Sequence, residues 1–280
     1  MPTIAEKRQT FRRLHEHGCF VIPNPHDIGT ARYLQGLGFK ALATTSAGFA
    51  FSRGLPDGTV SRAAMLAHIA EIVVAADVPV NADYEGGYAD DPDGVAESVR
   101  LCCETGVAGL SIEDSTGDAA EPLYPFDLAR ARVRAARAAI DTTGRDVVFT
   151  ARSEGFIRGR PDLAETVRRL KAYADAGADC LYAPGLKTRA EITAVIEAVA
   201  PKPVNVLMGG PSEFTLADLQ GMGARRISVG GALARAAWGG FMRAAKEIAD
   251  HGRFDGFADA ASGADLNTFF AADQERQPRA

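Results

Sequence analysis

The chain has 280 residues, of which 46% are hydrophobic and 24% charged, and 31 Lys and Arg against 36 Asp and Glu give a formal charge of −5. This composition is typical of a globular protein and excludes a disordered chain, a collagen and a coiled coil. The acidic balance argues against a nucleic-acid partner, and no apolar run approaches the roughly 18 residues of a membrane span, so we expect a cytoplasmic protein without membrane contact.

Short apolar runs recur along the chain, and between them lie Gly- or Asp-rich turns and Ala-rich amphipathic stretches. Runs this short, bounded by helix and strand breakers, are typical of strands that are buried on both faces. We expect eight such strands, at Phe20–Pro23, Ala41–Thr44, Val78–Ala82, Gly109–Ile112, Val147–Ala151, Cys180–Ala183, Val204–Leu207 and Ile227–Val229.

Helix start signals stand between several of these runs. Ser61 and Thr215 precede amphipathic stretches, and Asp91-Pro92 pairs a capping side chain with a proline at the first helical position. Arg160-Pro161-Asp162 has a similar pattern. The arginines at 130, 132, 134 and 137 alternate with apolar residues, which predicts a solvated helix face.

Eight strand–helix units in roughly 230 residues predict an α/β fold, a (β/α)8 TIM barrel. A doubly wound sheet is the alternative, but it more commonly uses five or six strands. We therefore expect residues 1–280 to form one barrel domain. The segment from about 232 to 280 exceeds what the barrel needs, and its phenylalanines must cover either this barrel or a neighbouring subunit.

Polar residues gather where the predicted strands end, the position of the active site in such barrels. A Gly-rich loop from Gly48 to Gly58 is expected after the second strand. The candidates are, in chain order, Ser46, Ala47, Asp57, Asp83, Glu85, Glu113, Arg152, Tyr182 and Asn205.

Carboxylates at the ends of the third and fourth strands would lie close together, and like charges at short range are unfavourable unless a cation neutralises them. Oxygen ligands without nearby Cys or His favour Mg²⁺, with Mn²⁺ as the alternative. Arg152 beside them offers a two-pronged contact for a substrate carboxylate. The other interpretation is a set of ion pairs that closes the end of the barrel and binds no ligand.

The motifs Thr44-Thr45-Ser46, Asp83-Tyr84-Glu85-Gly86-Gly87-Tyr88, Ile112-Glu113-Asp114, Ala151-Arg152 and Pro203-Val204-Asn205-Val206 occur in this order. Their order and spacing resemble those of the isocitrate lyase/phosphoenolpyruvate mutase superfamily over nearly the whole chain. The resemblance implies a Mg²⁺-dependent TIM-barrel enzyme that acts on small α-oxo or α-hydroxy carboxylates through a pyruvate-enolate type of intermediate. It also implies a C-terminal helix that is swapped onto a neighbouring subunit, in homodimers that pair into homotetramers.

The resemblance further implies roles for individual residues. Asp83 resembles the direct metal ligand, and Glu85 and Glu113 resemble partners that act through water. Ser46 and Ala47 resemble the segment that holds the substrate carboxylate, and Arg152 the arginine that grips it. Asp57 resembles a loop aspartate near the reacting centre, while Tyr182 and Asn205 follow as candidate substrate contacts at the strand ends.

The loop after the fourth strand, Asp114–Pro125, departs from the superfamily because it contains no Cys, His or Lys. This argues against a thiol-dependent isocitrate or methylisocitrate lyase and against phosphonopyruvate chemistry. We expect the remaining polar side chains of the loop, including Ser115 and Tyr124, at the surface. A carbon–carbon lyase or decarboxylase of an oxaloacetate-like acid comes first, a phosphonopyruvate-type mutase or hydrolase second, and a non-catalytic oxo-acid-binding protein third.

Overall fold

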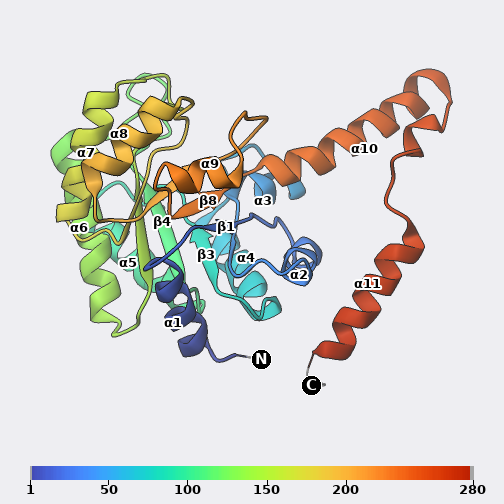
Figure 1. Ribbon diagram of the computed structural model, residues 1–280, viewed down its shortest axis with the longest axis horizontal. Coiled ribbons are helices and arrows are strands. Elements are labelled where there is room, and N and C mark those ends of the chain that lie inside the picture. Colours follow the sequence, from blue (N-terminus) through green and yellow to red (C-terminus); the bar gives the residue numbers. More distant parts are fainter. Residues whose placement is uncertain (1, 278–280) are drawn as a thin grey trace.

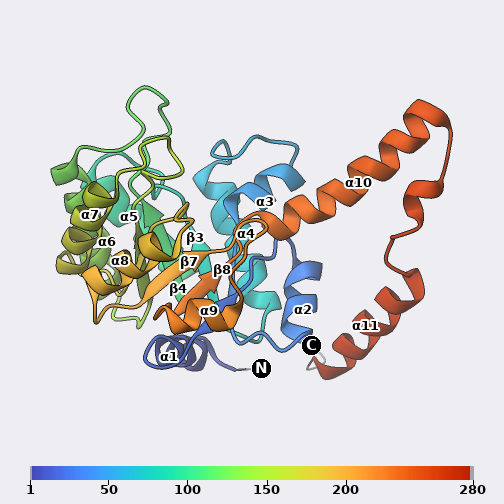
Figure 2. The same ribbon diagram turned by 45° about the horizontal axis from the view of Figure 1, so that its top comes forward.

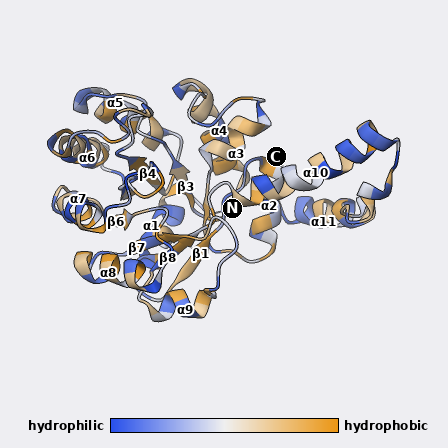
Figure 3. Cartoon of the chain, turned by 90° about the horizontal axis from the view of Figure 1, so that it is seen from above, coloured by the Kyte–Doolittle hydropathy of each residue, from blue (hydrophilic) through white to orange (hydrophobic). Residues whose placement is uncertain are grey.

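Eight short parallel strands form one sheet, in the order β1-β8-β7-β6-β5-β4-β3-β2, in the computed structural model, which describes residues 2–277. Ala43 donates its backbone N–H to the carbonyl of Pro23 at 3.0 Å, which brings β2 beside the end of β1 and nearly closes the sheet. The predicted (β/α)8 TIM barrel is confirmed, and Figure 3 shows helices around the strands. The strands are β1 Phe20–Ile22, β2 Leu42–Ala43, β3 Val80–Asp83, β4 Gly109–Glu113, β5 Val148–Arg152, β6 Cys180–Tyr182, β7 Val204–Leu207 and β8 Arg226–Ser228.

The helices that connect and follow these strands are labelled in Figure 1. Across residues 2–277, none of them is long and apolar enough to cross a membrane. Their bounds are α1 Ile4–Leu14, α2 Ile28–Gly36, α3 Ser46–Ser52, α4 Arg62–Ala75, α5 Pro92–Glu104, α6 Phe126–Thr142, α7 Leu163–Asp175, α8 Arg189–Val199, α9 Leu216–Gly221, α10 Ala232–His251 and α11 Gly263–Arg276, with a short 3₁₀ turn η1 at Asp255–Phe257.

All eight predicted strands are present, but three of them reach one residue further than predicted. β3, β4 and β5 end on Asp83, Glu113 and Arg152, and Glu113 pairs with Arg152 in the β4–β5 ladder. The charged side chains thus lie on the last residue of a strand and not in the loop after it. Their backbone is therefore held by the sheet.

The capping side chains of Ser61, Asp91 and Thr215 accept backbone hydrogen bonds at the starts of α4, α5 and α9, as predicted. The start of α7 differs from the prediction, because Asp162 is its cap and Pro161 lies outside the helix.

Two local predictions are wrong. The expected loop from Gly48 to Gly58 begins as a helix, since α3 covers Ser46–Ser52 and is capped by Thr45. Arg132 does not face solvent: it is 1% exposed and stacks over the ring of Tyr124 at 3.9 Å. The ring and three nearby backbone carbonyls replace the water that would hydrate the Arg132 guanidinium at the surface.

Helix α1 covers the end of the barrel opposite the predicted site. Phe11 is fully buried against Phe20 and Val148, near the starts of β1 and β5. Gly109 allows this contact, because a Cβ there would lie 2.5 Å from the Phe11 ring. The N-terminal end of the barrel is therefore closed by apolar side chains.

Helices α10 and α11 form an arm that extends beyond the barrel and returns toward α2 (Figures 1 and 2). Asp273 of α11 accepts two hydrogen bonds from the buried guanidinium of Arg32, at 2.7 and 2.9 Å. Phe269 packs on Tyr33, and Gly36 makes room for it, since a Cβ there would lie 2.6 Å from the Phe269 ring. Part of the tail from 232 to 280 thus covers its own barrel, and residues 278–280 lie outside the described residues.

Candidate active site

A cavity of about 170 Å³ opens at the carboxyl ends of the strands and reaches into the barrel. Seven of the nine predicted site residues line it. They are Ser46, Ala47, Asp57, Asp83, Arg152, Tyr182 and Asn205. Glu85 and Glu113 line a neighbouring pocket of about 360 Å³.

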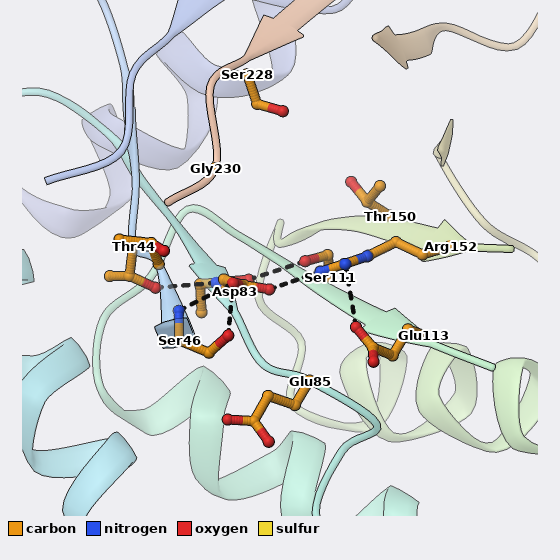
Figure 4. Close-up of polar contacts among 12 residues, drawn as sticks. Thr44, Ser46, Asp83, Glu85, Ser111, Glu113, Thr150, Arg152, Ser228 and Gly230 are labelled. Carbon is orange, nitrogen blue, oxygen red and sulfur yellow. Dashed lines mark hydrogen bonds and ion pairs between the residues drawn. The ribbon is translucent and has the colours of Figure 1, made fainter. Parts of the chain in front are cut away.

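Asp83 is the centre of the polar contacts at the mouth of the cavity (Figure 4). Its Oδ2 accepts hydrogen bonds from the backbone N–H and the hydroxyl of Ser46, at 3.0 and 3.1 Å. Its Oδ1 pairs with Nη1 of Arg152 at 2.7 Å, and its backbone N–H donates to Thr44 Oγ1 at 2.9 Å. The last residue of β3 is thereby tied to the segment after β2 and to the end of β5.

Arg152 pairs with three carboxylates at once. Besides Asp83, it contacts Glu113 at 3.1 Å and Glu154 at 2.9 Å. Its guanidinium also lies 5.0 Å from the centre of the Tyr182 ring. A guanidinium offers five N–H donors in a planar fork, which explains how one arginine joins strand ends β3, β4 and β5.

Glu154 lies beneath this arginine and is fully buried. Burial raises the pKa of Glu154, and its Oε2 has no hydrogen-bond partner in the described part of the chain. Asp114 fixes its position by accepting the Glu154 backbone N–H at 2.8 Å. Asp114 itself accepts from the Tyr173 hydroxyl at 2.6 Å and from Arg169 at 3.1 Å.

Glu85 makes no contact with the Asp83–Arg152 pair in Figure 4. It accepts a hydrogen bond from the Tyr88 hydroxyl at 3.1 Å. Burial, followed by the charge of Asp83, raises the pKa of Glu85 to about 7. Both Glu85 and Tyr88 have positive φ, at 46° and 57°, a conformation that non-glycine residues adopt at a cost and that is concentrated at functional sites.

Asp57 approaches the same group from the loop after α3. Its Oδ1 accepts from the Ser46 hydroxyl at 3.3 Å, and burial together with the charge of Asp83 raises the pKa of Asp57. The Ser46 hydroxyl thus links Asp57 to Asp83.

The three predicted metal ligands are only partly brought together. Arg152 lies between Asp83 and Glu113, and Glu85 faces the neighbouring pocket. Among residues 2–277, no three His, Cys, Asp or Glu side chains are close enough to hold a metal ion by themselves. Ion pairs at this end of the barrel, the other interpretation of the sequence, are therefore present, with Arg152 between Asp83 and Glu113.

The donor set nevertheless fits a hard divalent cation. Burial raises the pKa values of Asp57, Glu85 and Glu113, and the charge of Asp83 raises them further, because these like charges lie near one another. Mg²⁺ binds oxygen donors and keeps several waters, so it needs only one or two protein carboxylates. Asp83 would hold it directly, and Glu85 and Glu113 would hold its waters.

The loop after β4 closes one side of the site. Ser115 pairs with Leu123 in an isolated bridge, and Tyr124 donates to Asp90 at 2.5 Å. Ser115 and Tyr124 are 6% and 8% exposed, so the prediction that both lie at the surface is wrong. Tyr124 is covered by Arg132, a long-range contact that the loop sequence does not encode.

Sequence reasoning missed several polar residues of the cavity wall, among them Asn24 and Arg226. Asn24 Oδ1 accepts the backbone N–H groups of Val229 and Gly230, at 3.0 and 2.9 Å, and joins β1 to the end of β8. Asn24 directly follows a predicted strand, so its position was a usable signal. Arg226 precedes the predicted β8 run and carried no such signal.

Comparisons with known proteins agree with this architecture. Residues 11–249 match the family model for phosphoenolpyruvate phosphomutase. An uncharacterised protein of Mycobacterium tuberculosis is 36% identical over 225 residues, which are 79% of this chain and 81% of the relative. An oxaloacetate decarboxylase of Paraburkholderia xenovorans is 30% identical over 79% of this chain and 74% of its own.

A crystal structure from Burkholderia cenocepacia, of a protein named only provisionally as a lyase or mutase, has a TM-score of 0.91 with 50% identity and covers 96% of both chains. The structure of an oxaloacetate acetylhydrolase with its product oxalate has a TM-score of 0.86 with 27% identity and covers 98% of this chain and 97% of its own. The chain therefore belongs to the phosphoenolpyruvate phosphomutase family, within the PEP mutase/isocitrate lyase superfamily.

Proposed function

We propose that this protein is a Mg²⁺-dependent lyase or decarboxylase of a small α-oxo or α-hydroxy carboxylate, with an oxaloacetate-like acid as substrate. The observation that carries the proposal is the junction of Asp83, Ser46 and Arg152 at the mouth of a small polar cavity. The cavity has room for roughly ten water-sized groups, which is comparable to a four-carbon dicarboxylic acid. Relatives named for oxaloacetate chemistry support the same substrate class.

The chain's own groups have separate tasks in this proposal. Ser46 and the Ala47 backbone amide bind one substrate carboxylate at the start of α3, where the helix terminus favours an anion. Arg152 binds the same carboxylate with its fork, and Tyr182 and Asn205 line the space for the rest of the substrate.

In a decarboxylation the bond between the substrate's third carbon and its distal carboxyl carbon breaks, CO₂ leaves, and the electron pair stays on the oxo-acid fragment. A proton must then reach the third carbon. Asp57 is the proposed donor, because it borders the cavity and its raised pKa favours holding a proton. Glu113 supports the reaction by keeping Arg152 in place.

When bound, Mg²⁺ would supply Lewis-acid stabilisation of the charge that develops on the substrate oxygen. Asp83, Glu85 and Glu113 are the residues proposed to hold it. Mn²⁺ has the same preference for oxygen donors and is the alternative.

The loop at residues 114–125 supports decarboxylation over the other lyase reactions. It contains no Cys, His or Lys to act as a second acid or base, and loss of CO₂ needs only one proton donor. Phosphonopyruvate-type mutase or hydrolase chemistry is the second candidate, favoured by the family model that matches the chain.

The test is pyruvate release from oxaloacetate with Mg²⁺, measured above the rate that the metal alone produces. We expect Asp83→Asn to lower the rate at least about a hundredfold, because one catalytic contact is worth about 2.7–4 kcal/mol. Asp93→Asn, an exposed aspartate of α5, is the matched control and should leave the rate unchanged. If wild type and Asp83→Asn both stay at background across oxo, hydroxy and phosphono acids, catalysis is refuted, and a non-catalytic oxo-acid-binding protein is left.

We further propose a homodimer or homotetramer in the cytoplasm. Trp238, Phe241 and Met242 of α10 are 38%, 63% and 55% exposed, and large exposed apolar patches mark interaction surfaces. A second copy that packs on α10 would bury them. Sedimentation of wild type and of Phe241→Asp tests this, and a wild-type monomer at micromolar concentration would overturn it.

A further inference from the structure

The middle of the barrel interior is polar, although such barrels are usually filled by branched aliphatic side chains. Asn81, Ser111, Asn205 and Arg226 point into the cavity, and each is at most 4% exposed. Thr150 from β5 belongs to the same layer and is fully buried. The apolar side chains lie in the layer below, against α1.

Arg226 is the only charged member of this layer, and all of its contacts are neutral. Its Nε donates to Asn205 Oδ1 at 2.9 Å, and its Nη2 donates to Thr150 Oγ1 at 3.0 Å. Its Nη1 lies 3.3 Å from Nε2 of His15. His15 Nδ1 is 2.8 Å from the carbonyl of Phe11, so Nδ1 carries the proton and Nε2 accepts from the arginine.

The two arginines of the cavity therefore differ in their charge balance. Arg152 at the mouth faces three carboxylates, whereas Arg226 has no carboxylate within 4.0 Å in the part of the chain that the structure describes. A buried charge without a counter-ion is unfavourable, because it has lost its hydration. An anion that enters the cavity would gain more binding free energy from the uncompensated charge of Arg226 than from the already neutralised charge of Arg152.

Donors remain for such an anion. A guanidinium has five N–H groups, and three of them are used by Asn205, Thr150 and His15, which leaves two. Ser228, whose oxygen accepts from Asn205 Nδ2 at 2.9 Å, keeps its own hydroxyl proton to donate.

We propose that Arg226, with Ser228, forms an anion-binding subsite at the floor of the cavity and makes the enzyme selective for dicarboxylates. One carboxylate would bind at the mouth and the other would reach down into the barrel to Arg226. The inference rests on the proposed function for the chemistry at the mouth, and it adds which residue recognises the second acidic group.

Calorimetric titration in the presence of Mg²⁺ tests the subsite. The two probes are 3,3-difluorooxaloacetate, a dicarboxylate, and pyruvate, an oxo acid with one carboxylate. We expect wild type to bind the dicarboxylate at least about tenfold more tightly, as one charged hydrogen-bond contact provides. Arg226→Gln should lose this preference and keep the pyruvate affinity within about twofold.

Arg225→Gln is the matched control, since this arginine is adjacent in sequence, lies outside the cavity lining and bonds to the carbonyl of Gly18. It should keep the full preference. Urea unfolding without ligand is the second measurement, and it verifies that Arg226→Gln is folded under the conditions of the titration, since the three buried acceptors of Arg226 lose their donors in this variant.

The results separate this inference from the proposed function. A wild-type protein that binds both probes equally overturns the subsite without any variant, and so does a folded Arg226→Gln that keeps its preference. If no oxo acid is turned over but the dicarboxylate preference depends on Arg226, the subsite stands and the proposed reaction fails. If oxaloacetate is turned over but wild type shows no preference for the dicarboxylate, the proposed reaction stands and the subsite is overturned.

Discussion

Asp114 offers the sharpest test of how the site is supported, because it is 3% exposed and its carboxylate accepts hydrogen bonds from three donors on two different segments. It accepts the Tyr173 hydroxyl and Arg169 Nη1 from α7 and the backbone N–H of Glu154 after β5. Asp114→Asn keeps the size of the side chain but removes its charge, and it turns an amide N–H₂ toward donors. Arg169 then loses its most buried counter-charge.

The magnitude follows from two estimates that agree. Loss of one partner of a buried ion pair costs about 3–5 kcal/mol. Two charged hydrogen bonds at about 1.5–3 kcal/mol each give a similar sum. Because Arg169 keeps Glu165 at 2.8 Å and the carbonyl of Tyr124 at 3.0 Å, we expect the lower part of the range, about 3 kcal/mol.

Urea unfolding followed by circular dichroism measures this loss. Asp127→Asn is the matched control: its ion pair with Arg130, at 3.2 Å, is solvent-exposed, so its removal should cost less than about 1 kcal/mol. A loss below about 1 kcal/mol in Asp114→Asn would refute the reasoning, since it would mean that water replaces the carboxylate at a position described as buried.

Three further predictions concern other parts of the chain. Burial and the charge of Arg226 lower the pKa of His15 to about 3 from an ordinary 6.5. The folded state therefore keeps this ring neutral, while the unfolded chain takes up a proton below pH 6.5. The free energy of unfolding is full above that pH, is lower by about 2 kcal/mol at pH 5, and continues to fall toward pH 3. Urea unfolding at pH 7.5 and 5.0 should show this loss in wild type and a smaller one in His15→Gln, and equal losses would contradict it. Asp273→Ala removes the buried partner of Arg32 and should release α11, seen as faster amide exchange and faster proteolysis of residues 263–276, with no change in the barrel. A chelator should abolish calorimetric binding of oxalate, and unchanged binding would remove Mg²⁺ from the proposed function.

The strands could be predicted because each is a short apolar run between breakers, and a barrel then brings their carboxyl ends together. That rule alone brings Asp83 and Arg152 into one site, far apart as they are in sequence. The pattern did not identify α3, because its Gly and Phe residues are poor indicators of a helix, and it begins directly at the site with Ser46.

Pairing between side chains could not be predicted in the same way. Which carboxylates Arg152 contacts depends on rotamers and on distances of a few ångströms between strands, and these are properties of the folded barrel. Arg132 and Arg226 were missed for a related reason: an arginine among apolar residues reads as a surface position unless its buried partners are known. For Arg132 these are the Tyr124 ring and backbone carbonyls, and for Arg226 they are Asn205, Thr150 and His15.

The charge balance at the mouth connects the proposed metal to the proposed substrate contact. Arg152 is already shared by Asp83, Glu113 and Glu154, so a substrate carboxylate must compete with these groups for its donors. A divalent cation held at Asp83 would take over part of this negative charge and leave the fork freer to bind substrate. Metal and carboxylate binding should therefore favour each other, because the cation would release donors of Arg152 that the anion then uses, and because the cation attracts the anion.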